Sequence, residues 1–406
     1  MINLPFASSI RVIIAVVATA LVPLASQAGE PLQVYILAGQ SNMVGHARAH
    51  TVATLFASDQ DRDHQLLEMI LTDDSGLSRE TLEQQLERGR LLDELTGGIS
   101  NEKIKSMEAG PEKDKLEARV KELKKAHEAY KQSIATACVD SDRVYITSIA
   151  DGNKRSGKLA IGYGGSRDKI GPEYGFGLAM AQKVDAPILI IKTSWGGKSL
   201  NYNFRPPSVG PYTLNEKEKE SDKPDEILAN AGLNYRMMNE EVHKVLDDLP
   251  NHHPAYNADD GFEIAGFVWF QGFNDQFAPE FRDNYKDNMI AFIADVRKEY
   301  ASPNLPFVIG VLGTPVTEEK IAENQVSVGQ RQAAQELGVE NHVTSVESYK
   351  EYSHYSNQVF QKGWPEHYHE WDTVGSDRPY HYLGSGAFFV RLGDAFANAM
   401  HELRQP

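Results

Sequence analysis

The stretch Gln33-Val34-Tyr35-Ile36-Leu37-Ala38, followed by Gly39-Gln40-Ser41-Asn42-Met43, decides the fold. From Val34 to Ala38 every side chain is apolar or aromatic, which is typical of a strand that is buried on both faces. The glycine that follows permits a tight turn, so the strand is expected to end there. A strand of this kind belongs to a parallel sheet that helices cover on both sides.

Three later runs have the same character, at 185–191, 264–270 and 307–312. Segments with helical periodicity lie between them, and the chain closes with a helix from about Ser385. Strands that alternate with helices predict a three-layer α/β/α fold with a mostly parallel, flavodoxin-like sheet. In such sheets ligands bind at the carboxyl ends of the strands.

Residues 50–137 interrupt this alternation. Ser78 is placed as a helix N-cap, Gly97-Gly98 would end that helix, and apolar positions four and three apart run through 116–137, with His127 in the seam. The pattern predicts an inserted antiparallel helical hairpin that buries its own seam. Both a solvated decoration and a lid or partner surface are open interpretations of it.

The net charge of the sequence indicates which kinds of partner the protein can bind. The 406 residues hold 41 Lys+Arg against 57 Asp+Glu, a net charge of −16. Proteins that bind nucleic acid normally present a basic field, so the sequence predicts no nucleic-acid partner. The single cysteine, Cys138, excludes an intrachain disulfide. Nothing in the sequence indicates an oligomeric state.

Residues 1–28 have the composition of an export signal. Arg11 precedes a run of apolar and small residues from Val12 to Ala25, and Ser26-Gln27-Ala28 supplies small residues for cleavage. We expect cleavage after Ala28 and a mature protein, 29–406, in the periplasm or outside the cell; an uncleaved membrane anchor is the alternative. No later stretch is long and apolar enough to span a membrane.

The predicted strand ends carry the residues with chemical potential. Ser41 follows the first strand, where a serine has a fixed position and nearby backbone N–H groups, as a nucleophile requires. A helix N-cap serine would occupy the same position. Ser194-Trp195-Gly196-Gly197 follows the second strand and could present N–H groups to an anion, but Lys192 replaces the first glycine of a phosphate loop.

Two further segments complete the set of candidates. Asn274, after the third strand, could donate a side-chain N–H to an oxyanion, although a structural turn would use the same residue. Asp377 and His381 lie on one loop before the last helix, where an acid could orient a histidine that acts as base. A surface histidine in a loop is the alternative.

Taken together, these four segments resemble the SGNH hydrolase superfamily. More narrowly, Gly39-Gln40-Ser41-Asn42-Met43, Ser194-Trp195-Gly196-Gly197 and Trp269-Phe270-Gln271-Gly272 resemble the sialate O-acetylesterase and acetylxylan esterase group, of the carbohydrate esterase family 6 type. Gly171-Pro172-Glu173 resembles a further segment of that group. The resemblance covers about 29–48 and 139–403, and it excludes the helical insert.

The resemblance implies a role for each motif. Ser41 would be the nucleophile, His381 its base and Asp377 the acid. The oxyanion hole would use the Ser41 backbone N–H, a backbone N–H of Gly197 or Gly196, and the Asn274 side chain. Residues from the same motifs are expected to contact the substrate, and these are Gln40, Trp195 and Gln271.

The sequence departs from the resembled pattern at two points. Phe273 stands where the group usually has a glutamate, and a phenyl ring can neither accept a proton nor hydrogen-bond. Asp377 lies four residues before His381, whereas the superfamily places its aspartate three before. Asp372 and Asp275 are therefore alternative acids.

The function expected from these features is that of an exported serine esterase that removes O-acetyl groups from a carbohydrate. A non-catalytic carbohydrate-binding or partner protein on an esterase scaffold is the alternative, because Phe273 replaces a polar residue. A lipase or thioesterase would need a more apolar cleft. We expect no cofactor and no metal, since His367, His369 and Asp372 lack the spacing of helical zinc ligands.

Overall fold

The structure is a computed structural model that describes residues 29–314 and 317–405. The expected export signal, residues 1–28, lies outside the described residues. Within those ranges, no helix combines the length and the apolar character that a membrane crossing requires.

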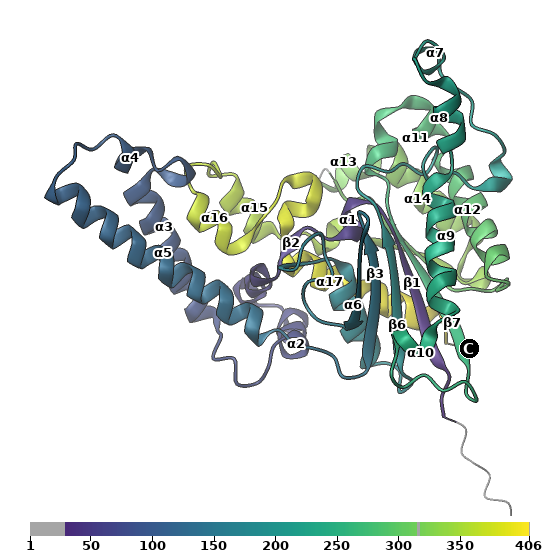
Figure 1. Ribbon diagram of the computed structural model, residues 1–406, viewed down its shortest axis with the longest axis horizontal. Helices are drawn as coiled ribbons and strands as arrows, with labels where there is room; N and C mark the ends of the chain where they lie inside the picture. The colour runs from purple at the N-terminus through teal and green to yellow at the C-terminus, as the bar shows by residue number, and fades with distance from the viewer. Residues whose placement is uncertain (1–28, 315–316, 406) are drawn as a thin grey trace, which may run out of the picture.

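The centre of the molecule is a seven-stranded sheet in the order β4-β3-β6-β1-β7-β8-β9 (Figure 1). All neighbouring strands are parallel except β4, which pairs antiparallel with β3 at one edge. The predicted α/β fold with a mostly parallel sheet is confirmed. The strand bounds are β1 Leu32–Gly39, β3 Val144–Ala150, β4 Asn153–Lys158, β6 Ile188–Ser194, β7 Phe262–Phe270, β8 Phe307–Val311 and β9 Val343–Glu347, with a separate pair of β2 Ala47–Arg48 and β5 Lys169–Ile170.

Helices cover both faces of the sheet and build two projections beyond it. The α-helices are α1 Ser41–Val44, α2 Asp61–Ile70, α3 Arg79–Thr96, α4 Glu102–Lys105, α5 Pro111–Ala137, α6 Pro172–Ala181, α7 Glu216–Lys219, α8 Pro224–Asn230, α9 Leu233–Leu246, α10 Leu249–His252, α11 Pro279–Asp283, α12 Tyr285–Glu299, α13 Glu318–Glu323, α14 Gln325–Leu337, α15 His354–Phe360, α16 Tyr368–Val374 and α17 Gly386–Leu403. Short 3₁₀ segments include η4 Phe273–Phe277 and η7 Pro379–Gly384.

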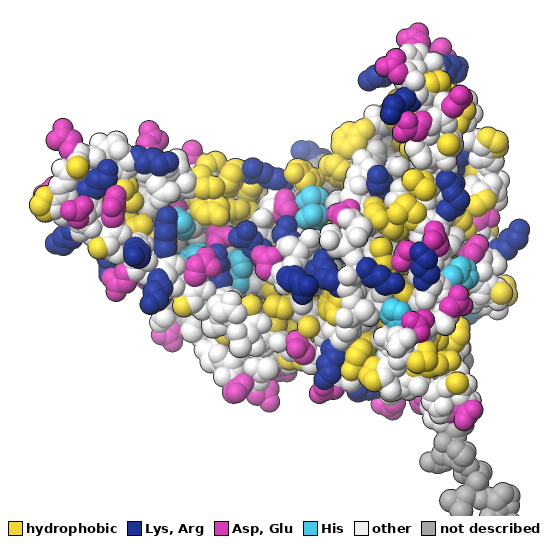
Figure 2. Space-filling model, viewed as in Figure 1, with side chains coloured by type: hydrophobic (Ala, Val, Ile, Leu, Met, Phe, Trp, Pro, Cys, Tyr) yellow, Lys and Arg dark blue, Asp and Glu magenta, His cyan; other side chains and the backbone are white. Residues whose placement is uncertain are grey.

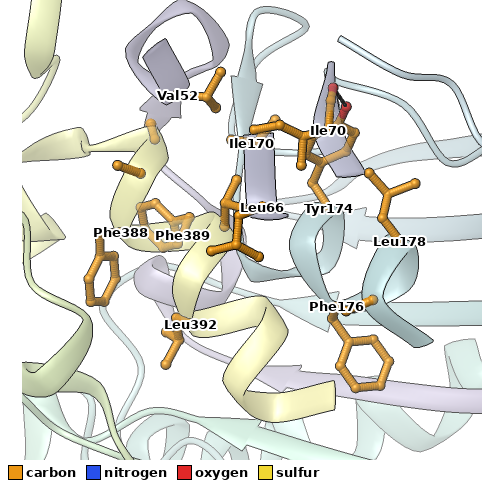
Figure 3. Packing of buried hydrophobic residues seen from close by; sticks show 14 of the residues in the cluster. Val52, Leu66, Ile70, Ile170, Tyr174, Phe176, Leu178, Phe388, Phe389 and Leu392 are labelled. Carbon is orange, nitrogen blue, oxygen red and sulfur yellow. Dashed lines mark hydrogen bonds between the residues drawn. The ribbon is translucent and has the colours of Figure 1, made fainter. Parts of the chain in front are cut away.

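Alternate side chains of β1 supply two separate cores, as the period of a strand requires. Tyr35 and Leu37 join a cluster that includes residues of α2, α6 and α17. Figure 3 shows part of this cluster, where Phe388 and Phe389 of α17 pack among residues of α2 and α6. Val34 and Ile36 point the other way, into a cluster with residues of α9, α12 and α14.

The carboxyl ends of the three central strands are level with one another. Gly39 at the end of β1 pairs with Ser194 of β6 on one side and with Phe270 of β7 on the other. A Cβ atom on Gly39 would lie 2.1 Å from the carbonyl oxygen of Phe270, so only glycine fits there. The segments that begin at Gln40, Trp195 and Gln271 therefore start from one edge of the sheet.

The inserted region forms helices α2 to α5, and α3 and α5 lie side by side in Figure 1. The side chain of Ser78 caps α3, and Gly97 ends that helix in a left-handed conformation. Only the outer part of the seam is self-contained, in a small cluster of Leu92, Val120 and Leu123. Leu82, Leu86 and Ile134 belong to the main core, so the expectation that the hairpin buries its own seam is wrong for its inner half.

Candidate active site

The candidate site lies on the floor of a valley between two projections. Helix α1, which begins at Ser41, lies between α15–α16 on one side and α11–α13 on the other (Figure 1). Figure 2 shows that the surface is hollowed between these projections and that hydrophobic side chains gather on both walls. The Ser41 residue is 8% exposed, so most of it is held in place by its surroundings.

A buried hydrogen-bond network orients Asn274 toward this floor. The Oε1 atom of Gln40 accepts bonds from the backbone N–H groups of Gly272 and Asn274 and from the side chain of Gln271. Three surrounding donors fix the Gln40 amide, whose Nε2 then donates to Oδ1 of Asn274 at 3.0 Å. The Nδ2 group of Asn274 finds no acceptor among the described residues and is free to donate to a ligand.

The residues expected to contact the substrate lie behind the site. Gln40 is 1% exposed and Gln271 is 2% exposed, and both are occupied by internal hydrogen bonds. Trp195 is also buried, with its ring 6.0 Å from that of Phe204 and its backbone N–H bonded to the carbonyl of Gly39. Their placement makes them residues that position the site from below.

One of the two glycines considered for the oxyanion hole is already occupied. The backbone N–H of Gly196 donates to the carboxylate of Asp151 at 2.7 Å. The backbone N–H of Gly197 has no acceptor within the described part of the chain, which leaves Gly197 as the available donor. The loop is close to the serine, because a Cβ added to Gly196 would lie 3.9 Å from the Cβ of Ser41.

Asp151 was missed in the sequence because its strand, β3, was not anticipated. It follows β3 directly and adopts a left-handed backbone conformation with φ of 48°, which is uncommon for a residue other than glycine. Its backbone N–H donates to the carbonyl of Ser194, so the residue joins two strand ends.

The loop that carries His381 is held against the segment after Ser41. The side chain of Asn42 donates to the backbone carbonyl of Tyr380 at 3.2 Å. The ring of His381 also stacks on that of His46, with centroids 4.1 Å apart and planes inclined by 5°. These two contacts bring a loop from the end of the chain to the segment that follows the first strand.

Asp377 is the carboxylate beside His381. Its Oδ1 lies 3.3 Å from Nδ1 of His381, within ion-pair range although the ring is not aligned for a hydrogen bond. Free enzymes often hold such pairs loosely and tighten them when substrate binds. Burial would raise the pKa of Asp377, but His381, the backbone N–H of Arg378 and the His46 ring outweigh it and lower this pKa below its usual value.

The other two candidate acids are engaged elsewhere. Asp275 is fully buried and accepts bonds from the backbone N–H groups of Leu200 and Asn201, and burial raises its pKa to about 6. Asp372 pairs with Lys131 at 2.8 Å and lies 3.4 Å from His127. Of the three acids, only Asp377 lies at His381.

His46 is a second site residue that the sequence did not reveal. Its Nδ1 lies 3.6 Å from Oδ2 of Asp377, so both histidines share one carboxylate. Burial, followed by the positive charges of His381 and Lys169, lowers the pKa of His46 to about 4. The His46 ring is therefore neutral at the pH where His381 would act as a base.

A buried ion pair lies beneath α1. Nζ of Lys192 is 2.9 Å from the carboxylate of Glu173, and both side chains are fully buried. The same Nζ donates to the backbone carbonyl of Val44, the last residue of α1. Burial lowers the pKa of Lys192. A lysine at the end of an otherwise apolar strand was the signal, since a buried charge requires a partner.

The backbone after His381 is strained and firmly anchored. Tyr382 and Leu383 are both left-handed, with φ of 49° and 64°. Each such residue costs on the order of 1–3 kcal/mol and persists only where its surroundings impose it. The hydroxyl of Tyr382 contributes by bonding the backbone N–H of Gly313 and the side chain of Ser348, each at 2.8 Å.

One group of side chains in the described ranges could ligate a metal ion. It consists of His46, Asp377 and His381, whose ligand atoms lie within 4.8 Å of one another. The two rings are parallel, so their in-plane lone pairs do not converge on one point. This arrangement fits two imidazoles that share a carboxylate better than a shared ion.

The chain is similar to a known family of carbohydrate esterases. A family model described as "Carbohydrate esterase, sialic acid-specific acetylesterase" matches residues 155–360, just over half of the chain. No curated protein sequence matches this chain.

Three solved structures match the chain at low sequence identity. A protein of Arabidopsis thaliana shares 15% identity over 91% of this chain and 98% of its own, with a TM-score of 0.42. XAC1771, a carbohydrate acetylesterase from Xanthomonas citri, shares 14% over 74% of this chain and 47% of its own, with a TM-score of 0.35. NanS shares 12% over 78% of each chain, with a TM-score of 0.33.

Proposed function

The chain belongs to the carbohydrate esterase family of sialic acid-specific acetylesterases, and we propose that it removes O-acetyl groups from a carbohydrate through a covalent acetyl-serine on Ser41. The family consists of hydrolases that act on ester bonds. The observation that carries the serine mechanism is the meeting of His381 and Asp377 with the segment that follows Ser41.

The first half of the reaction acylates the serine. His381 takes the proton of the Ser41 hydroxyl while Oγ attacks the acetyl carbonyl carbon, and Asp377 stabilises the imidazolium that forms. The negative charge on the former carbonyl oxygen is met by backbone N–H groups of Ser41 and Gly197 and by Nδ2 of Asn274. The imidazolium then protonates the sugar oxygen as the ester bond breaks, and the deacetylated sugar leaves.

The second half repeats these steps with water. His381 accepts a proton from the water, whose oxygen attacks the acetyl carbon, and the same donors meet the oxyanion. Return of the proton to Oγ restores Ser41 and releases acetic acid, which gives its proton to the solvent as acetate forms. No cofactor is needed for the proton and acetyl balance.

Hydrolysis of ethyl acetate, followed by acid release at constant pH, tests the proposal directly. Wild-type protein should turn over this ester, and Ser41→Ala should abolish the activity while leaving the melting temperature unchanged. Mass spectrometry of quenched reactions should show a gain of one acetyl group on the peptide that contains Ser41. Turnover that survives in Ser41→Ala would refute the mechanism.

We also propose that residues 1–28 direct export and that the mature protein begins at Gly29. The composition of this segment supports the proposal. N-terminal sequencing of protein recovered from the periplasm or medium should begin at Gly29, and a sequence that begins at Met1 would contradict it.

A further inference from the structure

A cavity of about 410 Å³ opens directly beside the proposed catalytic residues. It lies between η4, α15 and η7, and its wall includes Phe273, which precedes Asn274, and Tyr380, which precedes His381. Its volume falls within the range of about 300–1,000 Å³ that small-molecule sites occupy. A group bound there would be adjacent to an ester held at Ser41.

Two aromatic rings form the wall nearest the catalytic histidine. The rings of Phe273 and Tyr380 lie 5.9 Å apart, and the ring of Tyr380 is 4.5 Å from that of His381. Tyr380 is 45% exposed, so its ring is available to a ligand. Such rings present flat apolar faces on which the C–H face of a sugar ring can pack. Phe273 would therefore contact the sugar at the position where the resembled group has glutamate.

Two hydroxyl groups on the cavity wall make no hydrogen bond with the part of the chain that the structure describes. Thr314 is 6% exposed, and its Oγ1 makes no hydrogen bond with any described residue. Tyr352 is 3% exposed, and no hydrogen bond joins its hydroxyl to the described residues either. Burial raises the pKa of Tyr352 to about 12, so its hydroxyl keeps its proton. The buried Thr314 hydroxyl without a partner costs about 1–3 kcal/mol, which a ligand hydroxyl would recover.

The cavity lining is uncharged. Its remaining polar side chains are amides, among them Gln276 and Asn357, and no lysine, arginine, aspartate or glutamate takes part. The nearest arginine in the sequence, Arg378, is outside the lining, with its guanidinium 4.0 Å from the ring centroid of Trp364. A sugar carboxylate placed in this cavity would lose water without gaining a cation.

From these observations, and resting on the proposed function, we propose that this cavity binds an uncharged sugar ring of the acetylated substrate. The aromatic wall packs on the ring, and Thr314 and Tyr352 bond its hydroxyl groups. The protein therefore prefers neutral acetylated saccharides over acetylated sugars that carry a carboxylate.

The test compares three esters, which are an O-acetylated methyl xyloside, an O-acetylated sialic acid and ethyl acetate. Wild-type kcat/KM should be at least about tenfold higher for the xyloside than for the sialic acid. Phe273→Ala should lower the ratio of xyloside to ethyl acetate kcat/KM about tenfold, and Thr314→Val about fivefold. Phe262→Ala and Thr136→Val, on exposed surfaces away from the cavity, should leave this ratio unchanged.

Three results would overturn the inference. One is equal or faster hydrolysis of the sialic acid ester, above all if Arg378→Gln abolishes it. Another is a ratio of xyloside to ethyl acetate kcat/KM that stays the same in both Phe273→Ala and Thr314→Val. The third is faster hydrolysis of ethyl hexanoate than of ethyl acetate, with Phe273→Ala removing the advantage, which would make the cavity an acyl site.

Binding measurements separate this inference from the proposed reaction. In a Ser41→Ala background, calorimetric titration with the acetylated xyloside should show binding that Phe273→Ala weakens about tenfold. If wild-type protein hydrolyses none of the esters but the titration gives this result, the cavity assignment stands and the catalytic proposal fails. Absence of xyloside binding to the Ser41→Ala protein, together with active hydrolysis of ethyl acetate, would refute the cavity assignment alone.

Discussion

The two sides of the cleft are built in different ways. On the side of the nucleophile, Gln40, Asn274 and Gly197 all follow strands that end at one level, so the sheet itself places them. On the side of the base, His381 stands on a loop between α16 and α17 that no strand precedes directly. The first side is fixed by the ladder of the sheet, whereas the second depends on side chains from distant parts of the chain.

The inserted hairpin is one of the supports of the second side. The carboxylate of Asp93 on α3 accepts bonds from the backbone N–H groups of His369 and Glu370, at the start of α16. Asp372 on the same helix pairs with Lys131 of α5. A region that looks like a surface decoration therefore holds the helix that leads into the loop that carries His381.

The largest expected effect on kcat comes from removing either Ser41 or His381. His381→Ala should lower kcat for ethyl acetate by about 10³-fold or more, as should Ser41→Ala, because each residue is idle without the other. The double variant should be hardly less active than the worse single variant. Losses that multiply in the double variant would show that the two residues do not act as a unit.

A pair of aspartates on the base side separates catalysis from support. Asp377→Asn should lower kcat about as much as His381→Ala, because the amide no longer stabilises the imidazolium, with little change in stability. Asp372→Asn should instead cost about 1–3 kcal/mol of unfolding free energy, since it leaves Lys131 with only the exposed Glu128 as its ionic partner. Denaturant titrations and kcat values of both variants check this division, and near-normal kcat in Asp377→Asn would contradict it.

On the sheet side, Asn274→Ala should lower kcat about 10²–10³-fold by removing an oxyanion donor. Gln40→Ala should lower kcat in the same direction, because Gln40 fixes the orientation of the Asn274 amide. If that is its role, Gln40→Ala should add little in the Asn274→Ala background. A full additional loss in the double variant would assign Gln40 a separate function.

The free energy of unfolding should depend on pH mainly through buried histidines on the side of the site that carries His381, and less through groups on the sheet side. Burial lowers the pKa of His46, His50 and His369 to about 4. The unfolded chain takes up these protons below pH 6.5 and the folded chain does not, so stability falls between pH 6.5 and 4, by up to about 3 kcal/mol for each histidine.

Asp275, on the sheet side, changes the free energy of unfolding with pH in the opposite direction. Its raised pKa means that the folded chain is protonated between about pH 4 and 6 while the unfolded chain is not, so its contribution is lost as pH rises through that range. Asp275→Asn should therefore lose more stability on acidification than wild type. Urea titrations at pH 7 and 5 check both signs.

The smallest expected effect on stability comes from Asp93 of the hairpin, which caps the start of α16. Asp93→Ala should cost about 1–2 kcal/mol of unfolding free energy, because it removes two backbone partners at the start of α16. The exposed Asp59→Ala serves as a control that should cost little. A stability loss no larger than that of the control would show that the hairpin does not support α16 in this way.

The sequence by itself determined the sheet side of this protein. A run such as Val34–Ala38 is long and apolar enough to require burial on both faces, and the residue after such a strand is necessarily at the sheet edge. Ser41, the Gly196-Gly197 pair and Asn274 were therefore candidates from local pattern, since each follows a recognisable strand, and the resemblance implied their roles. Three strands of the sheet were missed. β3 and β9 have mixed polar and apolar residues, β4 has no apolar side chain, and Asp151 was missed with β3.

The arrangement of the base side depends on contacts between distant segments. Asp377 was the expected acid, with Asp372 and Asp275 as alternatives. The structure places Asp377 beside His381 on the same loop, and the packing of η7 against α1 brings this loop to the segment after Ser41. The stacking of His46 on His381 and the pairing of Lys192 with Glu173 join residues far apart in the chain. A local pattern records which faces must be buried, whereas the choice of a partner for a charge depends on which distant segments the folded chain brings together.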